Sequence, residues 1–316
     1  MTIKLFLVYW VVKNFVVSTD SCVDYFKSHL ENACVYCITL TRVLEGKEIT
    51  KHYNSSKEFD VFYNSLKKGA LPSTVALNPY ELQEHFEDIL KKEKTGDIIH
   101  VCISSGLSMS CENAQKVAEE LNATLSDRRI YVVDSLIATL GMNQMVDELI
   151  RMRDSGEKTS AAIKRIEELR GQQQGWIIMS DLFHLRRGGR ISGVRATIGT
   201  VLNIKPIIVI TKKGRLVLEN KMRGNGNAID YVIGKMKTLG EEVSTDFDKQ
   251  TFYIARTSES SLYEELKLAV TQKYPKAKIQ ESIVSPVIGT HLGCGAALVL
   301  FEGARRLNIN DKPRGA

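Results

Sequence analysis

The amino-acid sequence predicts an α/β protein with two domains. The first, over residues 14–165, is a mostly parallel three-layer α/β/α domain, and the second, over 166–316, is an α+β domain with a mixed or antiparallel sheet. Two patterns support this fold: apolar runs alternate with amphipathic stretches in the first half, and a hairpin pattern marks the second. The length of 316 residues agrees, because a single core rarely grows beyond roughly 250 residues.

Residues 1–13 are predicted to be an N-terminal extension outside both domains. Their apolar stretch, 5–12, is far shorter than the roughly 20 residues that a membrane-spanning helix needs. No small-residue cleavage site of a secretory signal follows it. We therefore interpret this segment as an added strand, a surface appendage or an extension from an upstream start.

The first domain is built from repeated strand–helix pairs. Continuous apolar runs typical of buried strands stand at 14–18, 34–40, 97–104 and 129–134. Helical patterns follow them, the first near 23–30. Because parallel neighbours need a crossover helix, this alternation predicts a mostly parallel sheet covered on both faces.

Two helix starts in the first domain carry explicit capping signals. Ser55 and Glu58 have the spacing of a capping box, and the helix that they open is predicted to end at Gly69. Asn78 stands before Pro79, which is the combination expected at the first turn of another helix.

The second domain is predicted to differ in character from the first. After a charged helix near 161–169, the run 204–220 reads as two strands joined by a turn at Lys213 and Gly214, hence an antiparallel hairpin. The remaining elements are strands at 176–180 and 251–255 and helices near 227–239 and 260–273. This mixture predicts an α+β arrangement.

Composition excludes several function classes. The 43 basic residues exceed the 37 acidic ones by only six, which is not the concentrated basic face of a nucleic-acid-binding protein. Six cysteines are scattered through apolar segments, so we expect reduced thiols and a cytoplasmic protein. Cys34 and Cys37 form a C-x-x-C pair, but no second pair completes a metal site. We expect neither metal nor cofactor.

A serine-rich segment is the first candidate for chemistry. Ser104, Ser105 and Ser108 follow a buried strand and precede a helix that begins near Ser110. Hydroxyls and backbone N–H groups at such a position can bind an anion. The alternative is that Ser108 merely caps the helix. Without a G-x-G-x-x-G or Walker A pattern, a nucleotide phosphate is disfavoured.

Two further single residues and one arginine cluster complete the candidates. Thr74 lies on a loop expected at the carboxyl edge of the sheet, where ligands of open α/β sheets bind. His291 stands between glycines in an apolar run and could orient one anionic group. The cluster of Arg186, Arg187 and Arg190 around two glycines suits a phosphate or an acidic partner, or is a solvated turn.

Taken in chain order, eight short segments resemble the DegV family, which includes the FakB fatty-acid-binding subunits of bacterial fatty acid kinase. The resemblance runs from about residue 14 to the C-terminus. The segments are STDSC (18–22), LPST (71–74), ISSGLS (103–108), VVDS (132–135), LRRGGRIS (185–192), LNIKPII (202–208), KMRG (221–224) and SPVIGTHLGCG (285–295).

The resemblance implies a protein that encloses one long-chain fatty acid in a tunnel between and within its domains. By motif position, Thr74, Ser108 and His291 would bind the carboxylate, and Ser104 and Ser105 are candidates for supporting contacts. Family members resemble carriers more than enzymes. They present the carboxylate to a separate ATP-dependent kinase, which the arginine cluster could dock, and transient contact with a membrane surface is compatible with this role.

Energetics agree with a lipid ligand. Burying about 14 methylenes contributes roughly 11 kcal/mol gross at about 0.8 kcal/mol each. A hydrogen bond to a charged group adds only about 1.5–3 kcal/mol. The tail would therefore dominate affinity, and the three polar residues would mainly fix the position of the head group.

Departures from the family pattern and two other functions remain to be weighed. Val75 replaces a serine, and Met109 and Cys111 stand where the family has glycine and an aromatic residue.

One alternative function is a serine esterase or thioesterase with Ser108 as nucleophile and His291 as base, although the G-x-S-x-G elbow and an orienting acid are missing. The other alternative is a lipid sensor without a kinase partner.

Overall fold

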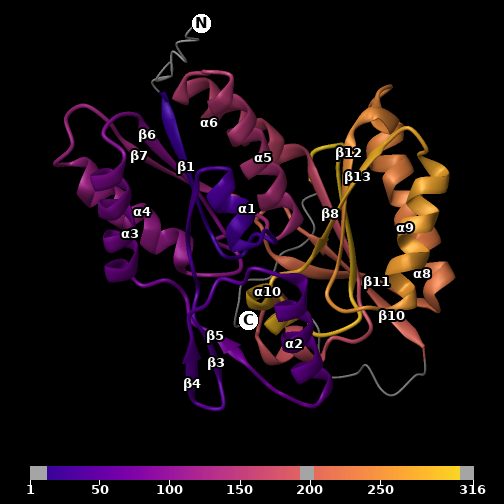
Figure 1. Ribbon diagram of the computed structural model, residues 1–316. Helices are drawn as coiled ribbons and strands as arrows, with labels where there is room; N and C mark the ends of the chain where they lie inside the picture. The colour runs from indigo at the N-terminus through magenta and orange to yellow at the C-terminus, as the bar shows by residue number, and fades with distance from the viewer. Residues whose placement is uncertain (1–12, 193–202, 307–316) are drawn as a thin grey trace, which may run out of the picture.

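The computed structural model describes residues 13–192 and 203–306, so the predicted extension lies almost entirely outside the described residues (Figure 1). The first sheet is parallel throughout, with strand order β2-β1-β6-β7. Its strands are β1 (Phe15–Asp20), β2 (Val35–Ile38), β6 (Asp97–Cys102) and β7 (Ile130–Asp134). The predicted parallel sheet is confirmed.

Helices cover both faces of this sheet. Helices α3 and α4 pack together on one face, whereas α5 and α6 pack together on the other (Figure 1). Apart from α2, which is described below, the helices in the first half of the chain are α1 (Lys27–Asn32), α3 (Pro79–Lys92), α4 (Ser110–Asn122), α5 (Leu140–Asp154) and α6 (Thr159–Gln172). The three-layer α/β/α arrangement is therefore confirmed. Helix α6 runs across the predicted domain division between residues 165 and 166.

The two predicted helix starts have different outcomes. At Asn78 the capping box forms: the Asn78 side chain accepts from the N–H of Glu81, and the Glu81 carboxylate accepts from the N–H of Asn78. At α2 (Ser56–Lys67) the predicted box at Ser55 is wrong, because the Ser55 side chain makes no cap hydrogen bond. Instead the Glu58 carboxylate pairs with Lys51 and accepts from the backbone N–H of Asn54.

A small antiparallel sheet, absent from the sequence prediction, extends away from the first domain (Figure 1). It contains β3 (Arg42–Leu44), β4 (Lys47–Ile49) and β5 (Ser73–Thr74), in the order β4-β3-β5. Thr74 pairs with Arg42 across this sheet. The backbone of the candidate residue Thr74 is therefore held by strand pairing rather than by a free loop.

The second sheet is mixed and has the order β13-β12-β14-β8-β10-β11-β9 among the described residues. Strands β10 and β11 form the predicted antiparallel hairpin. The strands are β8 (Gln173–Ile178), β9 (Ile191–Ser192), β10 (Ile204–Ile210), β11 (Leu216–Arg223), β12 (Thr251–Arg256), β13 (Lys278–Ile283) and β14 (Ala297–Glu302). This mixed sheet confirms the predicted fold class of the second half.

Two longer helices and several short ones complete the second half. Helices α8 (Asn225–Met236) and α9 (Ser261–Lys273) cover the outer face of the mixed sheet (Figure 1). The short ones are α7 (Phe183–Arg187), a π-helical turn (Lys237–Glu241), a 3-10 turn (Phe247–Lys249) and α10 (Pro286–Leu292). None of the helices in the described ranges is long and apolar enough to cross a membrane.

The apolar cores show how the two halves join. One core lies between the outer face of the mixed sheet and α8 and α9. The larger core is continuous from the parallel sheet to the inner face of the mixed sheet. Helix α5 lies in this larger core and contacts strands of both sheets. The inner face of the mixed sheet is thus turned towards the first domain, and this places a cavity between them.

Candidate functional site

An apolar cavity lies between the carboxyl edge of the parallel sheet and the inner face of the mixed sheet. Its empty volume is about 870 Å³, including solvent at the mouth. Leu40 and Ile103 line it from the first half, and Ile177 and Leu298 line it from the second. Cavities with such an apolar lining and a few polar groups hold small apolar ligands. The position matches the expectation that ligands of open α/β sheets bind at the carboxyl edge.

Thr74 and His291 meet at this cavity although 217 positions separate them in the sequence. Thr74 comes from β5 and His291 from α10, and both line the cavity. The Thr74 Oγ1 atom lies 2.8 Å from His291 Nε2, within hydrogen-bonding distance. A hydroxyl and an imidazole side by side can both contact one anionic group.

The close approach of α7 to α10 explains two glycines of the arginine segment. A Cβ atom at Gly188 would lie 2.3 Å from the Nδ1 atom of His291, so a side chain there would displace the ring. Gly189 has a φ of 66°, a left-handed conformation that favours glycine. Gly188 therefore lets the chain pass tightly beside the imidazole, and Gly189 supplies the left-handed turn that follows it.

Ser108 is buried and also lines the cavity. Its Oγ atom lies 2.9 Å from the Oγ atom of Ser110 and accepts from the Ser110 backbone N–H. The hydroxyl of Ser110 in turn accepts from the N–H of Leu77, just after the Thr74 strand. Ser110 thereby links the segment that carries Ser108 to the segment that carries Thr74.

Ser104 and Ser105 lie behind the cavity wall rather than in it. The Ser104 hydroxyl donates to the carbonyl of Gly214 at 2.8 Å, and its carbonyl accepts from the N–H of Ser108. The Ser105 hydroxyl donates to the Asp134 carboxylate at 2.6 Å. The Ser104 contact holds the Ser108 loop against the β10–β11 turn, whereas the Ser105 contact fixes that residue to the end of β7.

The three arginines of the cluster have different surroundings. Arg186 lies exposed on α7. Arg187, on the same helix, donates to the carbonyl of Pro72 and so contacts the segment before Thr74. Arg190 is half-buried, lines the cavity and donates to the carbonyl of Gly188. Only Arg186 and Arg187 present an exposed surface of the kind that a partner could contact.

One family model matches nearly the whole chain. The model for uncharacterised proteins of the DegV family matches residues 14–303. The chain belongs to the DegV family. A DegV domain-containing protein of Clostridium perfringens is 29% identical over 292 residues, 92% of this chain and 98% of that protein.

Solved structures of DegV proteins share the fold. DegV of Bacillus subtilis, described as a fatty acid binding protein, has a TM-score of 0.76 and 25% identity, covering 92% of this chain and 99% of that one. A DegV protein of Thermus thermophilus, described by its fatty acid binding, has a TM-score of 0.78 and 22% identity at the same coverage. The Streptococcus pneumoniae fatty acid kinase B3 protein, loaded with linoleic acid, has a TM-score of 0.75 and 18% identity, again at this coverage.

This DegV chain also contains a buried carboxyl group that the sequence analysis did not identify. Asp24 accepts from the backbone N–H of Ser285 at 2.9 Å and from the hydroxyl of Ser282 at 3.2 Å. Ser285 is the N-cap residue of α10, the helix that carries His291. Burial raises the pKa of Asp24 to about 7. No sequence signal marks Asp24, because its contacts are formed with residues far along the chain.

The departures from the family pattern also differ in position. Val75 lines the cavity and is exposed at its mouth. Met109 is exposed at the start of α4, whereas Cys111 is fully buried within that helix. Of the three, Val75 is therefore the one placed to contact a ligand that enters the cavity.

Proposed function

We propose that this protein is a cytoplasmic carrier that binds one long-chain fatty acid and presents its carboxylate to a separate kinase. The observation that carries the proposal is the meeting of Thr74, Ser108 and His291 on one apolar cavity. The wall away from these residues is apolar, as an acyl tail requires. The fatty acids described for the related DegV structures support the same ligand class.

In this proposal, each residue has a defined task. The hydroxyl groups of Thr74 and Ser108 donate to the carboxylate, and the imidazole of His291 fixes the direction of one oxygen. That oxygen forms the new bond to the γ-phosphorus of ATP held by the kinase, and ADP leaves. The carrier supplies orientation only, so it needs no nucleophile and no general base of its own.

The contacts of Ser108 argue against the hydrolase alternative. Within the described ranges, the hydrogen bonds of the Ser108 hydroxyl go to Ser110, whereas the Nε2 atom of His291 contacts Thr74. A hydrolase needs its nucleophile within hydrogen-bond reach of its base. The observed geometry therefore favours head-group binding over nucleophilic attack.

Native mass spectrometry of the purified protein tests the ligand class. We expect one fatty acid per chain, released on denaturation and identified by its mass. A variant with Thr74, Ser108 and His291 all replaced by alanine should exchange its lipid faster, because the head group loses its donors. Ser105→Ala is the matched control, since that hydroxyl contacts Asp134 outside the cavity. A wild-type protein that neither retains nor takes up a fatty acid would refute the proposal.

A further inference from the structure

Strand β8 forms part of the floor of the cavity, which it lines with Gly175, Trp176 and Ile177. Because side chains alternate along a strand, Gln173, Gly175 and Ile177 share the face that is turned towards the cavity. The chain continues from β8 into α7, whose C-cap residue Gly188 lies against His291. Ile177 is therefore on the head-group side of Gly175, and Gln173 lies on the opposite side.

Gly175 is a gap in this floor. A Cβ atom built there would meet Ile210 at 3.5 Å, Ile137 at 3.6 Å and Leu300 at 3.8 Å, all ordinary contact distances to residues that line the cavity. The backbone does not require glycine here, because the φ angle of Gly175 is not positive. A glycine inside a strand often marks the close approach of a ligand.

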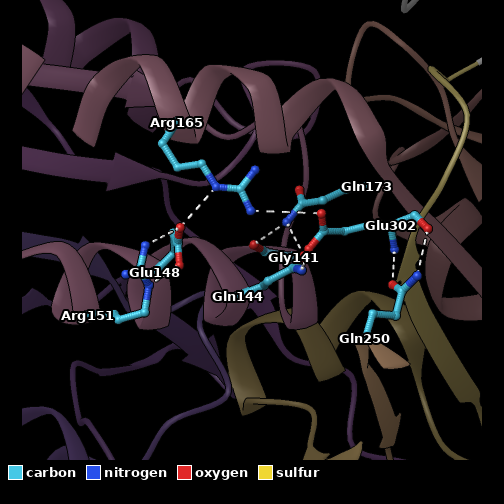
Figure 2. Close-up of polar contacts among 8 residues, drawn as sticks. All are labelled: Gly141, Gln144, Glu148, Arg151, Arg165, Gln173, Gln250 and Glu302. Carbon is cyan, nitrogen blue, oxygen red and sulfur yellow. Dashed lines mark hydrogen bonds and ion pairs between the residues drawn. The ribbon is translucent and has the colours of Figure 1, made fainter. Parts of the chain in front are cut away.

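Beyond Gly175, outside the cavity lining, the same face of β8 changes from apolar to polar at Gln173. Gln173 donates to the Gly141 carbonyl at 2.8 Å and to the Gln144 side chain at 3.0 Å (Figure 2). Gln144 donates to Glu302 at 2.8 Å, and Glu302 pairs with Gln173 across β14 and β8. The Nε2 atom of Gln173 is paired in this cluster, whereas its Oε1 atom is buried and has no hydrogen-bond partner among the described residues. An apolar chain end that moved between these groups would break hydrogen bonds in a buried place.

We propose that Gly175 determines the length of the acyl chain. The methyl end of the fatty acid lies over Gly175, in the space among Ile137, Ile210 and Leu300. The Gln173–Gln144–Glu302 cluster stops it from going further. This inference rests on the proposed function, because it needs a fatty acid whose carboxylate lies at His291.

Gly175→Ala and Gly175→Val test the inference through binding of a series of saturated fatty acids that differ in length. Each methylene forced out of the cavity costs about fourfold in affinity. We expect Gly175→Val to weaken binding of the longest acid that the wild type accepts by about 15-fold, the loss for two methylenes. Gly175→Ala should weaken it by about fourfold. Acids too short to reach Gly175 should bind as to the wild type.

A matched variant and a folding measurement separate this effect from damage to the protein. Gly226→Ala lies exposed on α8 with open space around its Cβ position, and it should change no chain-length preference. Because glycine is unfavourable in a strand, delipidated Gly175→Ala should melt at the same temperature as the wild type or above it.

Two outcomes would overturn the inference, and they can be told apart. If the wild type binds fatty acids and Gly175→Val binds every length as the wild type does, the proposed function stands and the length role is wrong. If the wild type takes up no fatty acid, the proposed function fails and this inference fails with it.

Discussion

Replacing Asp24 by asparagine should remove a large part of the pH dependence of stability. Asp24 is fully buried, and its carboxyl group connects the first domain to Ser285 at the start of α10. Asparagine keeps the shape and can still accept from the N–H of Ser285 through its side-chain carbonyl. It cannot ionise, so it isolates the effect of the charge.

The magnitude follows from the pKa of Asp24, which burial raises from 3.8 in the unfolded chain to about 7 in the folded one. Below pH 3.8 the group is protonated in both states, and its stabilising contribution is fully present. As the pH rises, the unfolded chain ionises first, and the contribution is lost until the folded protein ionises near pH 7. Linkage gives a loss of about 2 to 3 kcal/mol in the free energy of unfolding between about pH 5 and about pH 8.

Urea unfolding of both proteins at the two pH values measures this loss. We expect the wild type to lose more free energy of unfolding than Asp24→Asn between about pH 5 and about pH 8, with a difference of about 2 to 3 kcal/mol. Burial also raises the pKa of Asp20, Asp147 and Glu302. These groups are present in both proteins, so their effect cancels. Equal pH dependence in the two proteins would show that Asp24 does not hold its proton near neutral pH.

Three further predictions concern the head-group end and the exposed arginines. His291→Ala should reduce acyl-phosphate formation with a bacterial fatty acid kinase far more than it reduces lipid retention, and equal fractional losses would count against this. Arg186→Glu should raise the KM of the kinase for this protein, with a penalty that shrinks as salt rises; unchanged kinetics at low salt would indicate a solvated turn. Ser108 should resist labelling by a fluorophosphonate, and Ser108→Ala should lose on the order of 1–3 kcal/mol of lipid affinity. Stoichiometric labelling together with ester turnover would instead support the hydrolase.

The sequence predicts those parts of the fold that depend on local patterns. Continuous apolar runs mark β1, β6 and β7, because strands buried on both faces leave no alternation. The Asn78 cap and the turn at Gly214 are also local, since each needs only a few neighbouring residues. The capping box at Ser55 fails for the opposite reason. The Ser55 side chain makes no cap hydrogen bond, and the Glu58 carboxylate also contacts Lys51 and Asn54, which lie outside the two positions that define the box.

The candidate site depends on contacts that no local pattern contains. Thr74 and His291 come together only because β5 pairs with β3 and α10 packs beside it. Strands as short as β5 show no periodicity, so the small sheet could not be predicted. The position of Arg190 at the cavity could not be predicted for the same reason, because it depends on the packing of α7. The family resemblance, and not the spacing of these residues in the sequence, identified Thr74, Ser108 and His291 as one site.

The proposed function and the proposed role of Gly175 assign the two ends of the cavity to different residues. In the proposed function, His291 and Thr74 bind the carboxylate at one end through hydrogen bonds, each worth about 1.5–3 kcal/mol to a charged group. At the other, each methylene accommodated near Gly175 contributes about 0.8 kcal/mol. Because the proposed head-group and tail ends contact different residues, a change of chain length need not disturb the imidazole, and a change at His291 need not alter the space over Gly175. Under these two proposals, selection of the tail and presentation of the carboxylate are therefore separable, and each can be changed by substitution without the other.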